Sequence, residues 1–429
     1  MKTAPMLFVA MRNLFGRRAS GGRDLARKSL RGAVLSVAAS VVPLVVVLVV
    51  TDGMISGITD RYVELGTMHA QVVPRYGATH SALDEAAAAI ESLEGVRGAW
   101  PEIQAVGVAF ASGSRSGCAI RAVDPGFLDD RGTGEYLEVL AGEAKLAGPL
   151  DAVVGSVLAS ELGLEVGDTI NLATVRGSAN GFIPRVSIFR IRAIVSAGYR
   201  ELDARWIFIP LAAGRRVLSP ESSRSIIGVK FSSPDGDLGA KVEAVREVLS
   251  GSWSAYAWPE LERNLYESFR TTRAILLLIV GLVVAVAAAN VSSALVTLVT
   301  ERSSEIAVLK SVGASNRDVS RIFVAGGVLA GGLGATMGLA VGLAVAVNVN
   351  ALLRGIEALL GFLKNLALPG SERVTLLNPD YYLERIPIVV DPTALTAILA
   401  AALALSYVAS LLPAAKAARL SPLEILRKH

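Results

Sequence analysis

The sequence predicts a membrane protein with four transmembrane α-helices and a large α+β extracytoplasmic domain between the first and second of them. One observation behind this prediction is the composition of the 429 residues, of which 52% are hydrophobic and only 19% charged. Another is the uncharged run from Gly32 to Val50, which as a helix would be about 28 Å long, close to the thickness of a bilayer core. The third is that about 220 residues of mixed composition follow this run, and they predict an inserted domain.

Three further apolar runs lie nearer the C-terminus, at Ala274–Val299, about Ile322–Val347 and Ala394–Leu412. None of the four runs contains Asp, Glu, Lys, Arg or His. Proton relays, ion paths and carboxylate-based proteases need such residues within the membrane. The sequence therefore argues against an ion-coupled transporter and against an intramembrane aspartyl protease.

The Lys and Arg residues predict the orientation of the chain. Residues 1–31 carry eight of them against one Asp, residues 413–429 carry four against one Glu, and residues 301–321 carry four against three acidic residues. The positive-inside rule places both termini and the 301–321 loop in the cytoplasm, and the large domain outside. Because the first run is long and has no small-residue cleavage site at its end, we interpret it as an uncleaved anchor.

These observations predict nine segments along the chain. They are a cytoplasmic interfacial helix and basic segment (1–31), the first transmembrane helix and its stalk (32–66), a periplasmic α+β domain (67–257), a stalk and the second transmembrane helix (258–300), a cytoplasmic coupling loop (301–321), the third transmembrane helix (322–348), a periplasmic loop (349–392), the fourth transmembrane helix (393–412) and a cytoplasmic tail (413–429).

The stalk is predicted from apolar residues that recur at helical spacing on both sides of the outer domain. They are Ile55, Ile58, Tyr62 and Leu65 after the first span, and Trp258, Leu261, Leu265 and Phe269 before the second. Both stripes run into a span without a turn signal, so we expect two membrane helices to continue outward. The alternative is that both stripes belong to ordinary core helices of the domain.

The outer domain is predicted to be α+β. Since Cys118 is the only cysteine in the sequence, the domain must be stabilised by its own core rather than by disulfides. A helix is expected over about Ser81–Leu93, beginning at a Ser cap. Alternating apolar residues predict strands at Val186–Val195 and Ile227–Phe231. Residues 156–172 are expected to form a helix, a turn and a strand, and residues 174–185 a turn-rich stretch.

Glycines recur every four residues in the third span, at Gly334, Gly338 and Gly342, preceded by Gly327 and Gly331. This spacing lines one helix face and lets another backbone approach closely. The alternative is that glycine is simply common in membrane helices. The sequence favours close helix packing and leaves open whether the partner helix belongs to this chain.

The loop after the second span is predicted to contain a short amphipathic helix. Ile306, Leu309 and Val312 recur three residues apart, and Gly313 has the position of a helix end. Such a helix has the right size to dock in a groove of a cytoplasmic partner. The alternative is a solvated connector between two spans.

No catalytic or metal site is predicted. The nearest approach to a phosphate-binding loop, Gly22–Ser29, lacks the second glycine that lets the backbone surround a phosphate, and no nucleophile elbow is present. The three histidines, His69, His80 and His429, have no ligand spacing. We expect a chain that is not an enzyme, carries no cofactor and binds no nucleic acid.

Several segments together resemble the FtsX/MacB-type permease domain of type VII ABC systems, and most closely the lipoprotein-releasing permeases of the LolC/LolE type. The matching segments are Met6–Arg18, Val153–Asp168, Gly181–Arg185 before Phe189, Glu301–Asp318, Tyr381–Pro387 before Asp391, and Pro413–Arg427. The resemblance covers nearly the whole chain.

The resemblance implies a transporter subunit that extracts lipoproteins from the bacterial inner membrane by mechanotransmission. A separate dimer of cytoplasmic ATPase subunits would hold ATP and Mg²⁺, and would contact a coupling helix at Glu301, Glu305, Ile306, Leu309, Lys310 and Gly313. A periplasmic lipoprotein carrier would contact the family's hook, which falls here on Thr174–Pro184 and includes Gly177, Gly181, Phe182 and Pro184.

The other implied partners are membrane lipid, acylated lipoprotein cargo and a second permease, which is either a copy of this chain or a paralogue. Our hypothesis is that two first spans with their stalks form an apolar cargo groove, lined by Val46, Val50, Met54, Ile55 and Ile58. Two alternatives stay open: a MacB-like export permease for soluble cargo, and an FtsX-like signalling relay that controls a cell-wall hydrolase.

Overall fold

The computed structural model describes residues 25–178, 181–233, 236–249, 251–367 and 386–419. They divide into two compact units. The helical unit takes its residues from 1–53, 269–369 and 387–429, and the sheet unit takes its residues from 54–268 and 370–386. Each unit is described by itself below.

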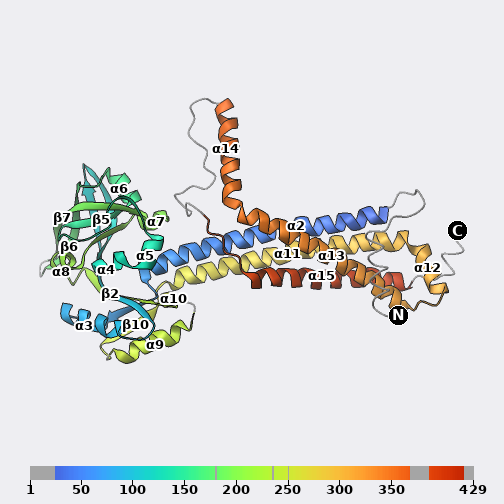
Figure 1. The fold of residues 1–429 in the computed structure, drawn as a ribbon, viewed down its shortest axis with the longest axis horizontal. Helices are drawn as coiled ribbons and strands as arrows, with labels where there is room; N and C mark the ends of the chain where they lie inside the picture. The colour runs from blue at the N-terminus through green and yellow to red at the C-terminus, as the bar shows by residue number, and fades with distance from the viewer. Residues whose placement is uncertain (1–24, 179–180, 234–235, 250, 368–385, 420–429) are drawn as a thin grey trace. The chain divides into compact units, whose positions relative to one another are not determined.

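Four long helices dominate the helical unit (Figure 1). They are α2 (Leu25–Arg61), α11 (Arg263–Glu301), α13 (Asn316–Val347) and α15 (Pro392–Arg419). Among the described residues these are the helices long and apolar enough to cross a membrane, and each contains one of the four predicted apolar runs. The third helix begins at Asn316, six residues before the predicted start of the span, because Ser315 and Asp318 form a capping box there.

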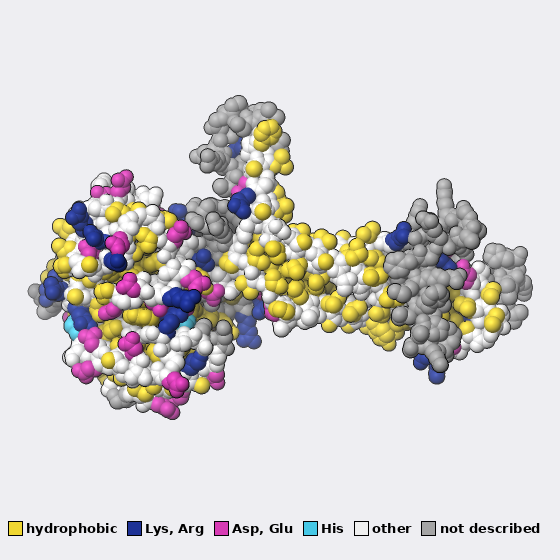
Figure 2. Space-filling model, viewed as in Figure 1, with side chains coloured by type: hydrophobic (Ala, Val, Ile, Leu, Met, Phe, Trp, Pro, Cys, Tyr) yellow, Lys and Arg dark blue, Asp and Glu magenta, His cyan; other side chains and the backbone are white. Residues whose placement is uncertain are grey.

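The four helices pack around one apolar core. Its buried members come from all of them and include Val41, Val45, Val291, Leu295, Phe323, Ala330, Ala402 and Ala414. Figure 2 shows hydrophobic side chains covering the middle of the bundle, whereas charged side chains gather on the sheet unit. An apolar exterior around an apolar core is what a helix bundle needs in a bilayer.

In the described residues between the spans there are two shorter helices. Helix α12 (Ser303–Ser311) lies within the predicted cytoplasmic loop. Two residues after its end comes Gly313, whose φ of +102° is a conformation that favours glycine. Helix α14 (Val349–Ala367) occupies the start of the segment that was predicted to be a periplasmic loop, so the first 19 residues of this segment form a helix. Apolar residues at helical spacing explain the helix.

The sheet unit contains a mixed ten-stranded sheet in its described residues. The order is β10-β1-β9-β2-β3-β8-β5-β7-β4, and β6 pairs with β2 and β7. The strands are β1 (Ala70–Pro74), β2 (Val96–Ala111), β3 (Ser114–Val123), β4 (Glu138–Gly142), β5 (Asp151–Gly155), β6 (Thr169–Ser178), β7 (Gly181–Ser196), β8 (Trp206–Pro210), β9 (Ser223–Phe231) and β10 (Trp253–Ala257). Pairs β3–β8 and β5–β7 are parallel, and the other pairs are antiparallel.

Short helices accompany this sheet. They are the π-helix η1 (Tyr62–Thr67), which continues α2 directly, and α3 (His80–Glu91), α4 (Pro125–Asp129), α5 (Arg131–Tyr136), α6 (Ser156–Leu162), α7 (Arg200–Asp203), α8 (Leu211–Val217), α9 (Leu238–Val248) and α10 (Trp258–Leu261). Helices α6 and α8 pack over one part of the sheet, and α3 and α9 over another, each with its own buried cluster. The α+β prediction is confirmed.

Three local predictions need correction. Helix α3 is capped by Thr79, which accepts the backbone N–H of Ala82, and not by Ser81. Residues 174–178 and 181–185 are strands rather than a turn-rich stretch, because they pair with one another as the antiparallel ends of β6 and β7. The second stalk stripe is interrupted at Glu262, which separates α10 from α11 and has a non-helical ψ of 43°.

Candidate functional site

The predicted coupling helix α12 has a buried side and an exposed side. Ile306 was predicted to contact the ATPase, which would require it to face outward. It is instead only 2% exposed and belongs to the bundle core, so it anchors α12. Leu309 is exposed, and so are Val308 and Val312, the latter at 84%. The exposed apolar surface of α12 therefore consists of Val308, Leu309 and Val312, of which the predicted contact set contained only Leu309.

The polar residues of α12 fix its position. Glu305 accepts a 2.7 Å hydrogen bond from Arg302 in the preceding turn. Lys310 reaches α15, where its Nζ donates a 2.6 Å hydrogen bond to the carbonyl oxygen of Ala418. Because a buried Ile306 and a bonded Lys310 hold the same helix, the exposed apolar surface is presented by a fixed element rather than by a loose loop.

The glycines of α13 lie on one stripe but face two helices in turn. A Cβ on Gly327 or Gly331 would collide with Ser410 or Ser406 of α15. Further along, a Cβ on Gly334, Gly338 or Gly342 would stand 2.7–2.8 Å from the Cβ atoms of Val37, Val41 and Val45 of α2. The helices approach this closely because glycine has no side chain. The partners of this stripe thus belong to the same chain.

The residues of the hypothetical cargo groove are all half-buried in the single chain: Val46, Val50, Met54, Ile55 and Ile58. Just beyond Val50, the Asp52 carboxylate lies 3.3 Å from Arg273 of α11. The same guanidinium lies 4.0 Å from Asp391, next to the start of α15. These ion pairs mark the level at which three of the long helices leave their apolar segments.

The hook prediction falls on the β6–β7 hairpin. Gly177 pairs in register with Phe182, Ser178 pairs with Gly181, and Pro184 pairs with Val175. Residues 179–180 lie outside the described residues, and so does the side chain of Phe182. Large apolar side chains are exposed along the outer face of this hairpin and the adjoining part of β2, namely Val106, Val108, Val175, Val186 and Ile188.

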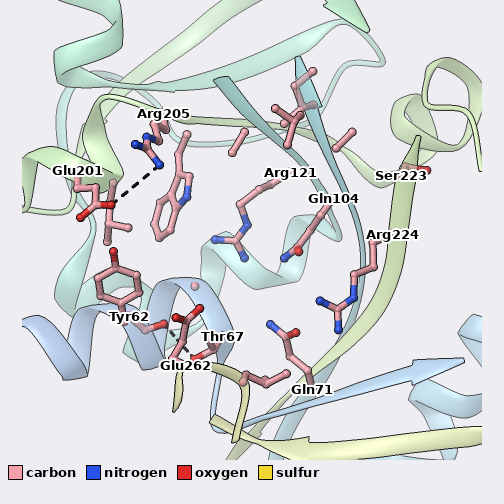
Figure 3. A pocket seen from close by; sticks show the side chains of 18 of the residues that line it. Tyr62, Thr67, Gln71, Gln104, Arg121, Glu201, Arg205, Ser223, Arg224 and Glu262 are labelled. Carbon is pink, nitrogen blue, oxygen red and sulfur yellow. Dashed lines mark hydrogen bonds and ion pairs between the residues drawn. The ribbon is translucent and has the colours of Figure 1, made fainter. Parts of the chain in front are cut away.

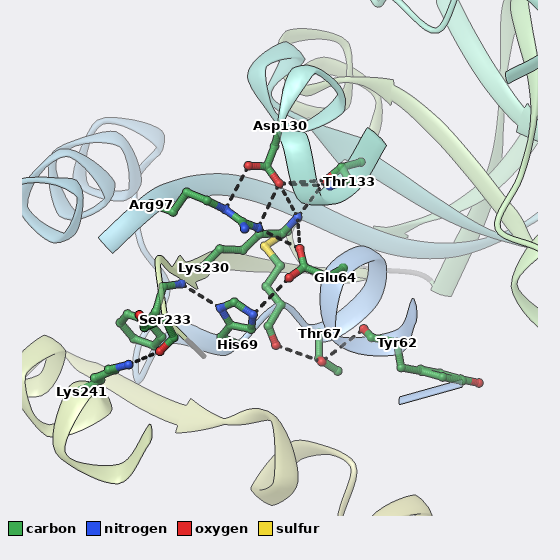
Figure 4. Close-up of polar contacts among 12 residues, drawn as sticks. Tyr62, Glu64, Thr67, His69, Arg97, Asp130, Thr133, Lys230, Ser233 and Lys241 are labelled. Atoms are coloured by element: carbon green, nitrogen blue, oxygen red, sulfur yellow. Dashed lines mark hydrogen bonds and ion pairs between the residues drawn. The ribbon is translucent and has the colours of Figure 1, made fainter. Parts of the chain in front are cut away.

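A cluster of charged residues, which sequence reasoning missed, lies inside the sheet unit (Figure 4). Lys230 of β9 is fully buried, and its Nζ lies 2.7 Å from Asp130, 3.0 Å from Glu64 and 2.8 Å from Thr133. Arg97 of β2 contacts both carboxylates, at 2.8 Å and 3.2 Å. The cluster therefore joins η1, β2, β9 and the segment between α4 and α5.

His69 completes the cluster through both of its ring nitrogens. The backbone N–H of Phe231 donates to Nδ1 at 2.8 Å, so this nitrogen carries a lone pair. The proton is then on Nε2, 3.2 Å from Glu64. No local pattern in the sequence points to these partners, because Glu64, Asp130 and Lys230 are far apart along the chain.

The electrostatics of the cluster follow from burial and pairing. Burial raises the pKa of Asp130, but the hydrogen bond and charge of Lys230, together with the N–H of Thr133 and the charge of Arg97, more than offset this and hold the pKa below its ordinary value. Burial lowers the pKa of Lys230, and its contacts with Asp130 and Glu64 restore only part of the difference. The cluster is a structural tie whose charges are mutually satisfied.

A recess of about 700 Å³ lies in the sheet unit between η1, the sheet and α10 (Figure 3). At its floor the guanidinium of Arg121 pairs with both oxygens of Glu102, at 2.6 and 2.7 Å, and also donates to the carbonyl oxygen of Leu65. Trp206 covers Arg121, with its ring centre 4.9 Å from the guanidinium carbon. Arg121 thus ties the end of η1 to β2 and β3.

The rim of this recess carries charges of both signs. Burial and the nearby carboxylate of Glu201 raise the pKa of Glu262, while Arg205 lies 4.0 Å from Glu201. Among the described residues, no group of three or more His, Cys, Asp or Glu side chains is placed to hold a metal ion. The recess offers polar contacts, and none of the side chains described above forms a nucleophile–base pair.

These features define a class of protein: a polytopic membrane protein with a large α+β domain after its first span. Comparison with known families gives the family itself. Residues 32–248 match the MacB-like periplasmic core domain, and residues 277–422 match the FtsX-like permease C-terminal domain. The chain belongs to the FtsX/MacB-like family of ABC-transporter permeases, and the predicted family and fold class are confirmed.

The chain is similar along most of its length to the lipoprotein-releasing system transmembrane protein LolC of Xylella fastidiosa, with 28% identity over 406 residues and 92% of each chain covered. It is also similar to the lipoprotein-releasing system transmembrane protein LolE of Haemophilus influenzae, with 28% identity over 287 residues, 65% of this chain and 64% of that one. Among solved structures, the periplasmic region of MacB from Actinobacillus actinomycetemcomitans aligns at 11% identity and a TM-score of 0.32, covering 47% of this chain and 94% of that one.

Proposed function

We propose that this chain is the permease subunit of an ABC transporter that extracts lipoproteins from the inner membrane. The observation that carries the proposal is the similarity to a lipoprotein-releasing transmembrane protein over 92% of both chains. The four bilayer-length helices and the absence of a phosphate-binding loop from the sequence agree with a transmembrane subunit that does not itself hydrolyse ATP.

The free energy needed to extract a lipoprotein can be estimated from its acyl chains. An acyl chain in a bilayer contributes about 0.8 kcal/mol per buried methylene, so a chain of about fifteen contributes on the order of 12 kcal/mol and three chains over about 30. Spontaneous release is therefore negligible. Extraction needs an energy source, which we assign to ATP and Mg²⁺ on a separate cytoplasmic ATPase dimer.

The exposed surface of α12 is the proposed contact with this ATPase. Val308, Leu309 and Val312 supply an apolar contact patch. Ile306 holds the other side of the helix in the bundle core. Because α12 follows α11 almost directly, a push on α12 would be passed to α11.

The cargo side is proposed to be formed by two permeases, either two copies of this chain or this chain and a paralogue. Val46, Val50, Met54, Ile55 and Ile58 are half-buried, so they retain apolar surface for acyl chains or for the second permease. Charged substitutions at Ile55 and Ile58 should block cargo binding, and cargo that still co-purifies would mean that the groove is elsewhere.

A periplasmic carrier is proposed to receive the cargo at the β6–β7 hairpin. The exposed side chains of Val175, Val186 and Ile188 would give such a carrier an apolar contact surface. The localisation that follows is the bacterial inner membrane with the large domain in the periplasm. The excess of Lys and Arg in residues 1–31 favours cytoplasmic termini.

The test is a mild-detergent pull-down of tagged protein from native membranes, followed by mass spectrometry of proteins and acylated peptides. A stoichiometric ATPase together with acylated lipoproteins is the expected result. An ATPase with only soluble cargo would indicate a MacB-like export permease, and an ATPase with a cell-wall hydrolase would indicate an FtsX-like relay. No ATPase at all would refute the assignment of α12.

A matched pair of variants tests α12 directly. Leu309→Glu places a charge in the exposed apolar surface and should abolish co-purification of the ATPase, whereas Leu309→Met preserves the apolar contact and should retain it. Both variants should elute and melt like the native protein, because Leu309 is exposed. Unchanged ATPase binding by Leu309→Glu would show that the contact lies elsewhere.

A further inference from the structure

Helix α14 starts where the membrane-spanning part of the bundle ends. It begins at Val349, and only Asn348 separates it from the end of α13 at Val347. The contacts of Gly334, Gly338 and Gly342 with Val37, Val41 and Val45 advance in equal steps of four along α13 and α2. If this register continues, Val349 lies at the level of Asp52, the first charged residue after the apolar run of α2.

The direction of α14 differs from that of the spans. In Figure 1, α14 leaves the end of α13 and runs across the long direction of the bundle instead of along it. Because the four long helices cross the bilayer, a helix that runs across them at the level of their ends lies in the plane of the membrane surface.

The side chains of α14 divide into two faces. Leu352, Ile356, Leu359 and Leu360 recur at helical spacing and are 50%, 39%, 58% and 36% exposed, respectively. The charged residues lie outside this stripe: Arg354 is offset from its centre by about half a turn, and Glu357 and Lys364 by about a third and a quarter of a turn. The stripe itself contains no charged residue.

We propose that α14 is an interfacial helix that lies on the outer surface of the membrane, with its Leu352–Leu360 stripe inserted into the boundary between headgroups and acyl chains. This is the arrangement expected for a helix with an apolar face, a charged face and a position fixed at the bilayer surface. Its three charged residues give a net charge of +1, so the contact is chiefly apolar.

A transmembrane placement of α14 is disfavoured by two observations. Glu357 would lie near the middle of the 19-residue helix and therefore near the bilayer centre, where a charge is costly. The chain also returns, at Asp391, to within 4.0 Å of Arg273, which pairs with Asp52. The fourth span thus starts from the same side of the membrane at which the third one ended.

The test uses the full chain in liposomes of phosphatidylethanolamine and phosphatidylglycerol. Single cysteines are introduced for nitroxide labelling at two stripe positions, Ile356→Cys and Leu359→Cys, and at two matched positions on the charged face, Arg354→Cys and Glu357→Cys. The native Cys118 stays in place, because it is 3% exposed and burial raises the pKa of its thiol to about 12. Native protein treated with the same nitroxide reagent is the control, and it should take up no label.

The measurement is the accessibility of each label to oxygen, which partitions into lipid, and to a water-soluble nickel chelate. The expected result is higher oxygen than nickel accessibility at positions 356 and 359, and the reverse at 354 and 357. Nickel access at all four positions would place α14 in water and overturn the proposal. Shielding of 356 and 359 from both reagents would mean that protein covers the stripe, and would also overturn it.

The inference does not depend on the cargo. The accessibility measurement needs only folded protein in a bilayer, so it can succeed if the lipoprotein proposal fails. Variants that do not elute and melt like the native protein are replaced by labels at Leu352 and Leu360, which belong to the same stripe and are likewise exposed.

Discussion

Substitution of Gly338 by Ala should weaken the packing of α13 on α2. The new Cβ would stand 2.7 Å from the Cβ of Val41 and 2.8 Å from the carbonyl oxygen of Ala38. Carbon atoms in contact prefer about 3.5–4.0 Å, so the helices must separate by about 1 Å. Neither obstacle is the flexible end of a side chain, and the strain cannot be relieved by a rotamer change.

The size of the effect follows from two opposing contributions. Overpacking of this kind costs about 1–3 kcal/mol, and replacing Gly by Ala inside a helix returns about 1 kcal/mol. A net loss of about 1 kcal/mol is therefore expected for Gly338→Ala. In the same helix, nothing lies within 4 Å of the position that a Cβ on Gly326 would take. Gly326→Ala is the matched control and should gain up to about 1 kcal/mol.

The assay is thermal unfolding of the full chain in detergent, followed by loss of the monodisperse elution peak. The melting temperature should fall for Gly338→Ala and stay equal or rise for Gly326→Ala. If the two substitutions shift the melting temperature equally and in the same direction, the close contact between α13 and α2 is not what makes Gly338 necessary.

Three further predictions concern the sheet unit. Lys230→Met should destabilise the protein by about 3–5 kcal/mol in denaturant unfolding, because it leaves two largely buried carboxylates with too few counter-charges. The control is Lys145→Met, which removes one partner of an exposed ion pair and should have no measurable effect. Acid should destabilise the native protein below about pH 4, because the folded-state pKa of Asp130 lies below its unfolded value. In this pH range the native state binds fewer protons than the unfolded state. The contribution of Asp130 to the stability is therefore lost as the pH falls through its folded-state pKa. Arg121→Lys should cost about 2–4 kcal/mol, since one ammonium group cannot replace the paired contacts with Glu102 and Leu65.

Each of these predictions has an outcome that contradicts it. Equal stability of the Lys230 and Lys145 variants would mean that the buried cluster is not a structural tie. In acid titrations monitored by tryptophan fluorescence, Lys230→Met should unfold at higher pH than the native protein, because Asp130 loses its main partner; an unchanged midpoint would argue against that pairing. For Arg121→Lys, unaltered unfolding would show that its hydrogen bonds to Glu102 and Leu65 add little to stability.

The elements of the fold that depend on local pattern could be predicted from the sequence. The alternation in Val186–Val195 corresponds to β7 and that in Ile227–Phe231 to β9, because side chains of a strand face its core at every second residue. The turn predicted at Gly163 and Gly167 corresponds to two residues with φ of +63° and +101°. Helix α14 was missed because the whole segment was assigned from its position between two spans, although its apolar period was readable.

The predicted coupling helix shows the limit of a local pattern. Ile306, Leu309 and Val312 form a stripe in the sequence, yet Ile306 packs inward and the other two are exposed. Helix α12 is too short for periodicity to decide which side meets the bundle. That choice depends on the core of the bundle, whose other members lie on the long helices and form one buried cluster with Ile306.

The sequence by itself determined the four spans, their order, the place of the inserted domain and the glycine stripe of α13. These properties depend on composition, run length and spacing, which are visible along the chain. Only the tertiary structure decided that the stripe faces α15 and then α2, that Lys230 joins Glu64 to Asp130, and that α14 runs across the bundle. Each of these depends on contacts or directions between segments distant in sequence, and such pairings are selected by the packing of the whole fold and leave no local signal.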